Sequence, residues 1–247
     1  MTSKTIPKVG KLYARSQNIK NGQGSLVAVE FLDKLIRGFA KNSANYINTA
    51  HEAPFVYRER QLASTLAPAL AKITHSFLVE LPVTREKISV KKKAKSDYKY
   101  LGWADYWVNY KGYDYYLELK HDFVSVISKK VTQSSLGKWK YMNETQLPDL
   151  EREAKYLSGE TKGIFTIALE VITIFNFRDK NYHSSELHDS EKLLSIQKRY
   201  FEEFKDCNWS GLWVLRNNLV ENCYYEDEKH KETYPAVLFL SKIKKIQ

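Results

Sequence analysis

Residues 163–177, with the sequence GIFTIALEVITIFNF, constrain the fold more than any other segment. The run is almost continuously apolar or β-branched, whereas a strand with one face in water alternates apolar and polar side chains. It therefore predicts a central β-strand that is covered on both faces. A chain of 247 residues can bury such a core in one domain, and its two cysteines are too few for a disulfide framework.

Periodic patterns on both sides of this strand predict the other elements. Apolar residues recur at helical spacing over residues 25–47, 57–74 and 131–157 and from Ser190 onward. Stretches rich in aromatic and β-branched residues predict strands at residues 76–83, 100–110, 113–123, 212–215 and 236–240. Pro68 is expected to kink or interrupt the second helix, and Gly137 and Pro148 the third.

The order of these elements predicts an α/β fold built around a mixed sheet. From residue 57 the order is helix, three strands, helix and strand, with an extra helix before it and a helix plus strands after it. The polar residues 1–24 are expected to form a flexible N-terminal arm. Residues 25–247 are expected to form a single domain, with a core at about 57–177 and a C-terminal extension at about 180–247.

The net charge of +10 favours a polyanionic partner, since excess Lys and Arg speeds the capture of phosphate polymers. An anionic membrane surface would attract the same charge, so composition alone does not separate the two. No apolar run approaches the ~20 residues that cross a bilayer, and residues 1–24 lack the apolar centre of a secretion signal. The sequence therefore predicts a soluble cytoplasmic protein.

Two carboxylates and an ammonium group are expected to meet within residues 102–122, GWADYWVNYKGYDYYLELKHD. Alternation along a strand places Glu118 and Lys120 on one face. A hairpin that turns at Lys111 and Gly112 brings Asp105 to about the position opposite Glu118. The alternative is a surface strand on which Glu118 and Lys120 form a weak ion pair.

Such a cluster is costly to bury unless it is paired or binds a cation. Its oxygen ligands suit Mg²⁺, with Mn²⁺ as a substitute. Asp105 and Glu118 are predicted to bind the metal, with the backbone carbonyl of Leu119 as a further ligand. Lys120 would orient or activate the attacking water and offset the charge that develops on phosphorus.

These residues resemble the PD-(D/E)XK, or restriction-endonuclease-like, nuclease superfamily. The matching segments are Gly102 to Asp105 (GWAD) and Glu118 to Lys120 (ELK), and the resemblance covers roughly half the chain. It implies a Mg²⁺-dependent deoxyribonuclease, most simply a DNA endonuclease. It also implies an acid from the first core helix, which matches Glu59, with Glu80 on the first strand as the alternate. Ala104 stands where the family often has proline.

The expected partner is nucleic acid, with DNA favoured over RNA, and two subunits could pair as a homodimer. Phosphate contacts are predicted for a set of lysines before and after the hairpin: Lys91, Lys92, Lys93, Lys95 and Lys138. His121 should face away from Glu118 and is expected to be structural. The competing interpretation is a catalytically inactive module on the same fold that binds nucleic acid or assembles with other proteins.

Overall fold

The structure is a computed structural model that describes residues 1–19, 22–86, 99–128, 130–157, 159–179 and 189–246. In these residues nine strands form one sheet: β1 (Thr2–Ile6), β2 (Gly10–Ser16), β3 (Ser76–Glu86), β4 (Lys99–Tyr110), β5 (Tyr113–Ser125), β6 (Ile164–Asp179), β7 (Trp209–Leu215), β8 (Tyr224–Glu226) and β9 (His230–Lys245). The strand order is β1-β2-β7-β9-β6-β5-β4-β3, and β8 pairs with β9. Among the strand pairs of the described residues only β5 and β6 run parallel, so the sheet is mostly antiparallel and open.

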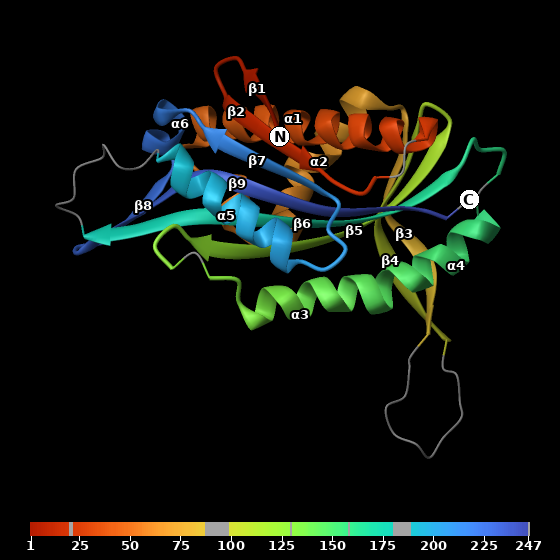
Figure 1. The fold of residues 1–247 in the computed structure, drawn as a ribbon. Helices are drawn as coiled ribbons and strands as arrows, with labels where there is room; N and C mark the ends of the chain where they lie inside the picture. The colour runs from red at the N-terminus through yellow and green to blue at the C-terminus, as the bar shows by residue number, and fades with distance from the viewer. Residues whose placement is uncertain (20–21, 87–98, 129, 158, 180–188, 247) are drawn as a thin grey trace.

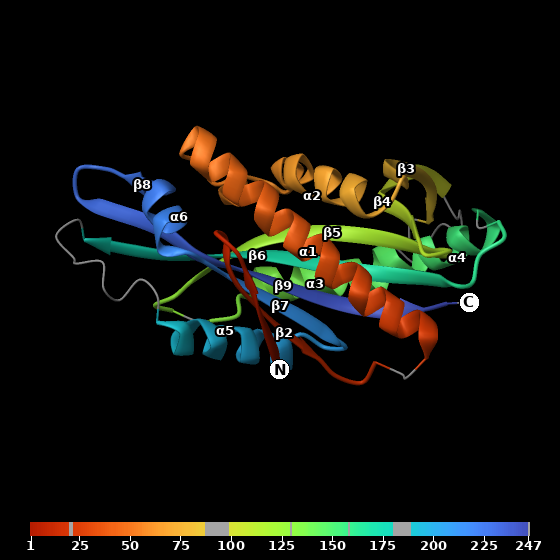
Figure 2. The same ribbon diagram turned by 90° about the horizontal axis from the view of Figure 1, so that it is seen from above.

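Helices cover both faces of the sheet (Figures 1 and 2). On one face lie α1 (Gln23–Ala50), the 3-10 turn η1 (Pro54–Val56), α2 (Glu59–Ile73) and α6 (Asn217–Asn222). On the other lie α3 (Gln133–Tyr141), the π-helical turn η2 (Met142–Gln146), α4 (Leu147–Leu157) and α5 (Ser190–Glu203). The predicted mixed α/β class is confirmed. The predicted order of helix, three strands, helix and strand also holds, from α2 through β3, β4 and β5 to α3–α4 and β6.

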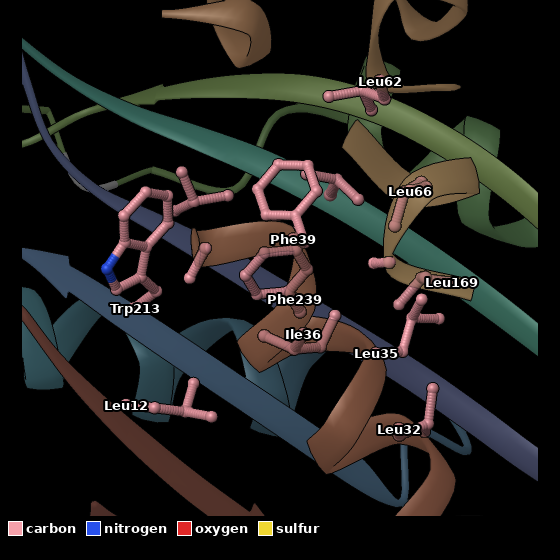
Figure 3. Close-up of a cluster of buried hydrophobic side chains, with 14 of the residues drawn as sticks. Leu12, Leu32, Leu35, Ile36, Phe39, Leu62, Leu66, Leu169, Trp213 and Phe239 are labelled. Carbon is pink, nitrogen blue, oxygen red and sulfur yellow. The ribbon is translucent and has the colours of Figure 1, made fainter. Parts of the chain in front are cut away.

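Strand β6 lies inside the sheet between β5 and β9, as its apolar sequence predicts. Ile167 and Leu169 pack toward α1 and α2, whereas Ala168 and Ile172 pack toward α3, α4 and α5. The cluster beneath α1 and α2 is shown in Figure 3, where Phe39 meets Phe239 edge-on at 5.3 Å between ring centroids. Each fully buried side chain of this size contributes about 1.5–3 kcal/mol to stability.

The prediction of a flexible arm over residues 1–24 is wrong for residues 2–16, which form the hairpin β1–β2 and pair with β7. Only Ile6, Val9 and Leu12 of this hairpin are fully buried, so its apolar pattern is too sparse to be read as a strand signal. Gly10 has φ of 139°, and a Cβ there would lie 2.0 Å from the Val214 carbonyl oxygen. Close approach to β7 therefore requires glycine at this position.

Two further expectations differ in detail. Helix α2 continues through Pro68, and α3 continues through Gly137. The third predicted helix is divided just before Pro148, where the π-helical turn η2 separates α3 from α4. The C-terminal strands are longer than predicted, and α6 and β8 were not predicted at all. No helix in the described part of the chain is both long and apolar enough to span a lipid bilayer.

Candidate active site

Asp105 lies where the sheet forks. Strand β4 pairs with β5 from Tyr106 to Tyr110, whereas β3 and β4 remain paired up to Glu86 and Lys99 and curve away from β5 together (Figure 1). Asp105 is the first residue of β4 beyond the part paired with β5. Its Oδ2 accepts a hydrogen bond from the Leu119 N–H at 2.6 Å. At the fork this carboxylate oxygen therefore takes the place of a β4 backbone carbonyl as the acceptor for β5.

The predicted hairpin geometry accounts for this position. Lys111 and Gly112 have φ of 54° and 80°, the left-handed conformation that a tight two-residue turn requires. The turn fixes the pairs up to Tyr106 with Leu117, and the next position along each strand is occupied by Asp105 and Glu118. The prediction that Asp105 lies beside Glu118 is therefore in agreement with the strand pairing.

Asp105 lines an open pocket of about 360 Å³ together with Glu59, Glu80 and Leu119. Glu59 is the first residue of α2, where the helix dipole favours a carboxylate. Glu80 has φ of 57° and lies between the pairs Val79–Tyr106 and Leu81–Ala104. Three acidic side chains from a helix and two strands thus line the same pocket.

Lys120 connects this pocket to α2. Its Nζ donates to the Leu119 carbonyl at 2.7 Å and lies 3.5 Å from Oε1 of Glu59. The Lys120 side chain is 17% exposed, whereas that of Glu59 is 39% exposed. The helix acid suggested by the family resemblance and the strand lysine are therefore in contact.

Glu118 has a partner that the sequence did not reveal. Its side chain is 1% exposed, and its Oε1 accepts a charge-assisted hydrogen bond from Arg85 Nη2 at 2.5 Å. The Arg85 guanidinium also donates to the carbonyls of Trp103 and Gln146. A Cβ at Gly102 would lie 2.4 Å from Arg85 Cγ, so glycine leaves room for the arginine. The predicted strand ended at residue 83, which left Arg85 outside it.

Burial raises the pKa of three carboxyl groups around the fork, those of Glu118, Asp105 and Glu59. Burial raises the pKa of Glu118 to about 7, and the nearby Asp105 charge adds to the rise while Arg85 opposes it. Burial likewise raises the pKa of Asp105, against the lowering effects of the Leu119 N–H and Lys120. Burial also raises the pKa of Glu59, which Lys120 lowers and the Asp105 charge raises. A cation in the pocket would relieve the repulsion between the Asp105 and Glu59 carboxylates.

The donor set fits Mg²⁺ in chemical kind, because carboxylate and carbonyl oxygens are its preferred ligands. Asp105 and Leu119 face the pocket, but Glu118 does not line it and is bound to Arg85. Across the described ranges, no group of three or more His, Cys, Asp or Glu side chains is arranged to hold a metal ion as it stands. Metal binding by all the predicted ligands would require Glu118 to leave Arg85 and turn toward the pocket.

Of the predicted phosphate-binding lysines, the structure describes Lys138 alone. Lys91, Lys92, Lys93 and Lys95 lie outside the described residues. Lys138, on α3, is 3.2 Å from Asp122 and donates to the His121 carbonyl at 2.9 Å. Its side chain is 37% exposed, so its ammonium group already has protein partners at the surface.

The predicted orientation of His121, away from Glu118, is confirmed. His121 is buried on the opposite face from Glu118, and its Nε2 lies 3.0 Å from Thr173 Oγ1. Burial lowers the pKa of His121 to about 4, and the ring is therefore neutral at physiological pH.

Glu170 is a buried acid that sequence reasoning also missed. In the register of the parallel strands β5 and β6, Glu170 lies opposite Lys120, and it is fully buried. Neither carboxyl oxygen has a hydrogen-bond partner among the described residues. Burial raises the pKa of Glu170 to about 8, and the nearby Asp122 charge adds to the rise. Its only sequence signal is an acid within the apolar run of residues 163–177.

Replacing Glu170 with glutamine should flatten the pH dependence of stability. Because its folded-state pKa lies above its ordinary value of 4.5, the folded protein loses stability as pH rises from about 4.5 to 8. Glu170→Gln removes this titration. The decrease in the free energy of unfolding between pH 5 and 8 should therefore be smaller in the variant by on the order of 2–4 kcal/mol. Urea unfolding at several pH values measures it, and an unchanged slope would contradict a buried carboxyl that titrates near neutrality.

Comparisons of the chain with models of protein families, with curated proteins and with solved structures found no match in any of the three.

Proposed function

We propose that this protein is a Mg²⁺-dependent nuclease that hydrolyses phosphodiester bonds, most simply as a DNA endonuclease. The observation that carries the proposal is that Glu59 and Asp105, from α2 and β4, line one open pocket at the fork of the sheet. Lys120 of β5 contacts two lining residues, Glu59 and the Leu119 carbonyl. A second support is the succession of α2, three antiparallel strands, a crossover helix and the parallel strand β6, which resembles the restriction-endonuclease-like core.

In this proposal each side chain has a separate task. Asp105, the Leu119 carbonyl and Glu118 would hold the metal, which supplies a polarised phosphate and a bound water of lowered pKa. Lys120 orients the attacking water and offsets the negative charge that develops on phosphorus. Glu59 holds the Lys120 ammonium group beside the pocket. Arg85 favours the ionised form of Glu118, and Glu118 would have to leave Arg85 to reach a metal in the pocket.

Substrate binding would use the positive charge of nearby lysines and the exposed side chain of Trp103. Trp103 is 53% exposed, whereas Trp107 is packed against the cluster beneath α3 and α4. An exposed indole two residues before Asp105 can stack on a base that has left the duplex. The lysines of residues 91–95 and Lys138 are proposed to contact the phosphate backbone, with DNA preferred over RNA.

A catalytically inactive nucleic-acid-binding module is the second candidate, and one observation favours it. The buried guanidinium of Arg85 already neutralises Glu118. A site that no longer binds a metal would also contain such a built-in cation. The two candidates share the expected binding of nucleic acid and differ only in metal-dependent cleavage.

Incubation with supercoiled circular DNA distinguishes the two. A nuclease should convert the circles to nicked or linear forms with Mg²⁺ or Mn²⁺ and leave them intact in EDTA. The matched control is Asp105→Asn, which keeps an oxygen for the Leu119 N–H but loses the charge. Salt-dependent binding without cleavage by either metal would reject the nuclease and support the inactive module.

A further inference from the structure

A second pocket, of about 270 Å³, lies where the C-terminal end of α1 meets β8 and β9. Four tyrosines line it, and we call it the tyrosine pocket: Tyr57, Tyr224, Tyr225 and Tyr234. The first three are 42%, 46% and 60% exposed, whereas Tyr234 is buried. This many accessible rings around one hollow is unusual for a surface that only covers a core.

The faces of these rings are suited to a cation. An aromatic face carries partial negative charge and attracts ammonium and guanidinium groups within about 6 Å. One such contact already exists, because Lys231 Nζ lies 3.9 Å from the centroid of the Tyr224 ring. Tyr225 is the most exposed of the four rings and belongs to the same strand.

A carboxylate and a helix end add to this preference for positive charge. Glu52 lines the pocket and accepts a hydrogen bond from the Tyr57 hydroxyl at 2.7 Å. His51, Glu52 and Ala53 immediately follow α1, whose last turn contains no basic residue. The partial negative charge of the α1 C-terminus is therefore not offset by its own side chains.

The surrounding sequence is acidic, although the chain as a whole is strongly basic. Residues 221–232 contain five acidic residues and two lysines, a net charge of −3 with histidine neutral, whereas the whole chain carries +10. Lys231, whose ammonium group lies over the Tyr224 ring, contributes a positive charge beside the pocket. A phosphate backbone would be repelled from this region, whereas a basic peptide would be attracted to it.

We propose that the tyrosine pocket binds the arginine side chain of a basic segment in a partner protein. A planar guanidinium can stack on tyrosine rings while it donates hydrogen bonds to Glu52 and to the carbonyls at the end of α1. The volume is below the range of about 300–1,000 Å³ that is usual for small-molecule sites, which suits one side chain. The proposal does not depend on nuclease activity, because none of its residues lines the pocket at Asp105.

The test uses the full-length protein and a short peptide that contains two arginines, compared with a peptide in which both are replaced by citrulline. Citrulline keeps the shape of the side chain and removes its charge. Binding is followed by NMR chemical shifts of the tyrosine rings and by fluorescence anisotropy at pH 8. The arginine peptide should bind at least about 5-fold more tightly than the citrulline peptide.

Variants test whether binding occurs in this pocket. Tyr225→Ala and Glu52→Gln should each weaken binding of the arginine peptide by about 3- to 5-fold, because both side chains are exposed and neither change disturbs the core. Tyr156→Ala is the matched control, since Tyr156 is 86% exposed on α4, and its binding should equal that of the wild type.

Three results would overturn the proposal. They are equal binding of the arginine and citrulline peptides, unchanged affinity in both Tyr225→Ala and Glu52→Gln, and displacement of the peptide by oligothymidylate that shifts the same tyrosine rings. The last would identify a pocket for nucleic-acid bases. Absence of DNA cleavage in the same preparation would bear on the nuclease proposal alone.

Discussion

Asp105→Asn is expected to lower Mg²⁺-dependent DNA cleavage by at least about 1,000-fold while the fold is retained. Asparagine keeps an oxygen that can accept the Leu119 N–H, so the fork between β4 and β5 should persist. What is lost is the negative charge that would bind the metal at the pocket. Single-turnover cleavage of a labelled duplex at saturating Mg²⁺ measures the loss, and far-UV circular dichroism checks the fold.

The matched control is Glu153→Gln on α4. Glu153 and Lys155 have the same spacing as Glu118 and Lys120, but they lie on a helix far along the chain from the fork. Glu153→Gln should cleave at the wild-type rate. An Asp105→Asn protein that also cleaves at that rate would exclude Asp105 from the chemistry, and with it the proposed site.

Local geometry explains why this part of the site could be predicted from the sequence. A two-residue turn fixes the pairing of the strands that flank it, so the position of Asp105 relative to Glu118 followed from Lys111 and Gly112. The apolar run of β6 likewise determined that both of its faces are buried. In both cases the signal depends on residues that are close together in the sequence.

The partner of Glu118 could not be predicted in the same way. Arg85 is 33 residues away, and its position depends on how β3 and β4 curve beyond the fork. Simple alternation also fails there, since Ala104 packs in the cluster with α4 whereas Tyr106 packs in the cluster with α1 and α2. The tyrosine pocket is likewise assembled from segments more than 160 residues apart, with no local pattern to reveal it.

Arg85→Met should have the largest effect on stability. Removing one partner of a buried ion pair typically lowers the free energy of unfolding by about 3–5 kcal/mol, since the other charge remains buried. The carbonyls of Trp103 and Gln146 would also lose their donor. As a control, Lys244→Met removes an exposed ion pair with Glu151 and should cost less than about 1 kcal/mol.

The pH dependence of this loss identifies Glu118 as its source. Burial already raises the folded-state pKa of Glu118 to about 7, and removing Arg85 should raise it further. A carboxyl with a raised folded-state pKa contributes its full stability below pH 4.5 and loses it as pH rises through the folded-state value. The deficit of Arg85→Met relative to the wild type should therefore be small at pH 5 and large at pH 8.

Urea unfolding of both proteins at these two pH values measures the difference. In the double variant Arg85→Met with Glu118→Gln, much of the deficit at pH 8 should disappear, because no buried charge is left without a partner. An equal loss at pH 5 and pH 8, unchanged in the double variant, would mean that Arg85 acts through the Trp103 and Gln146 carbonyls alone. Arg85 would then be a structural residue, and the proposal that it keeps Glu118 ionised for metal binding would fail.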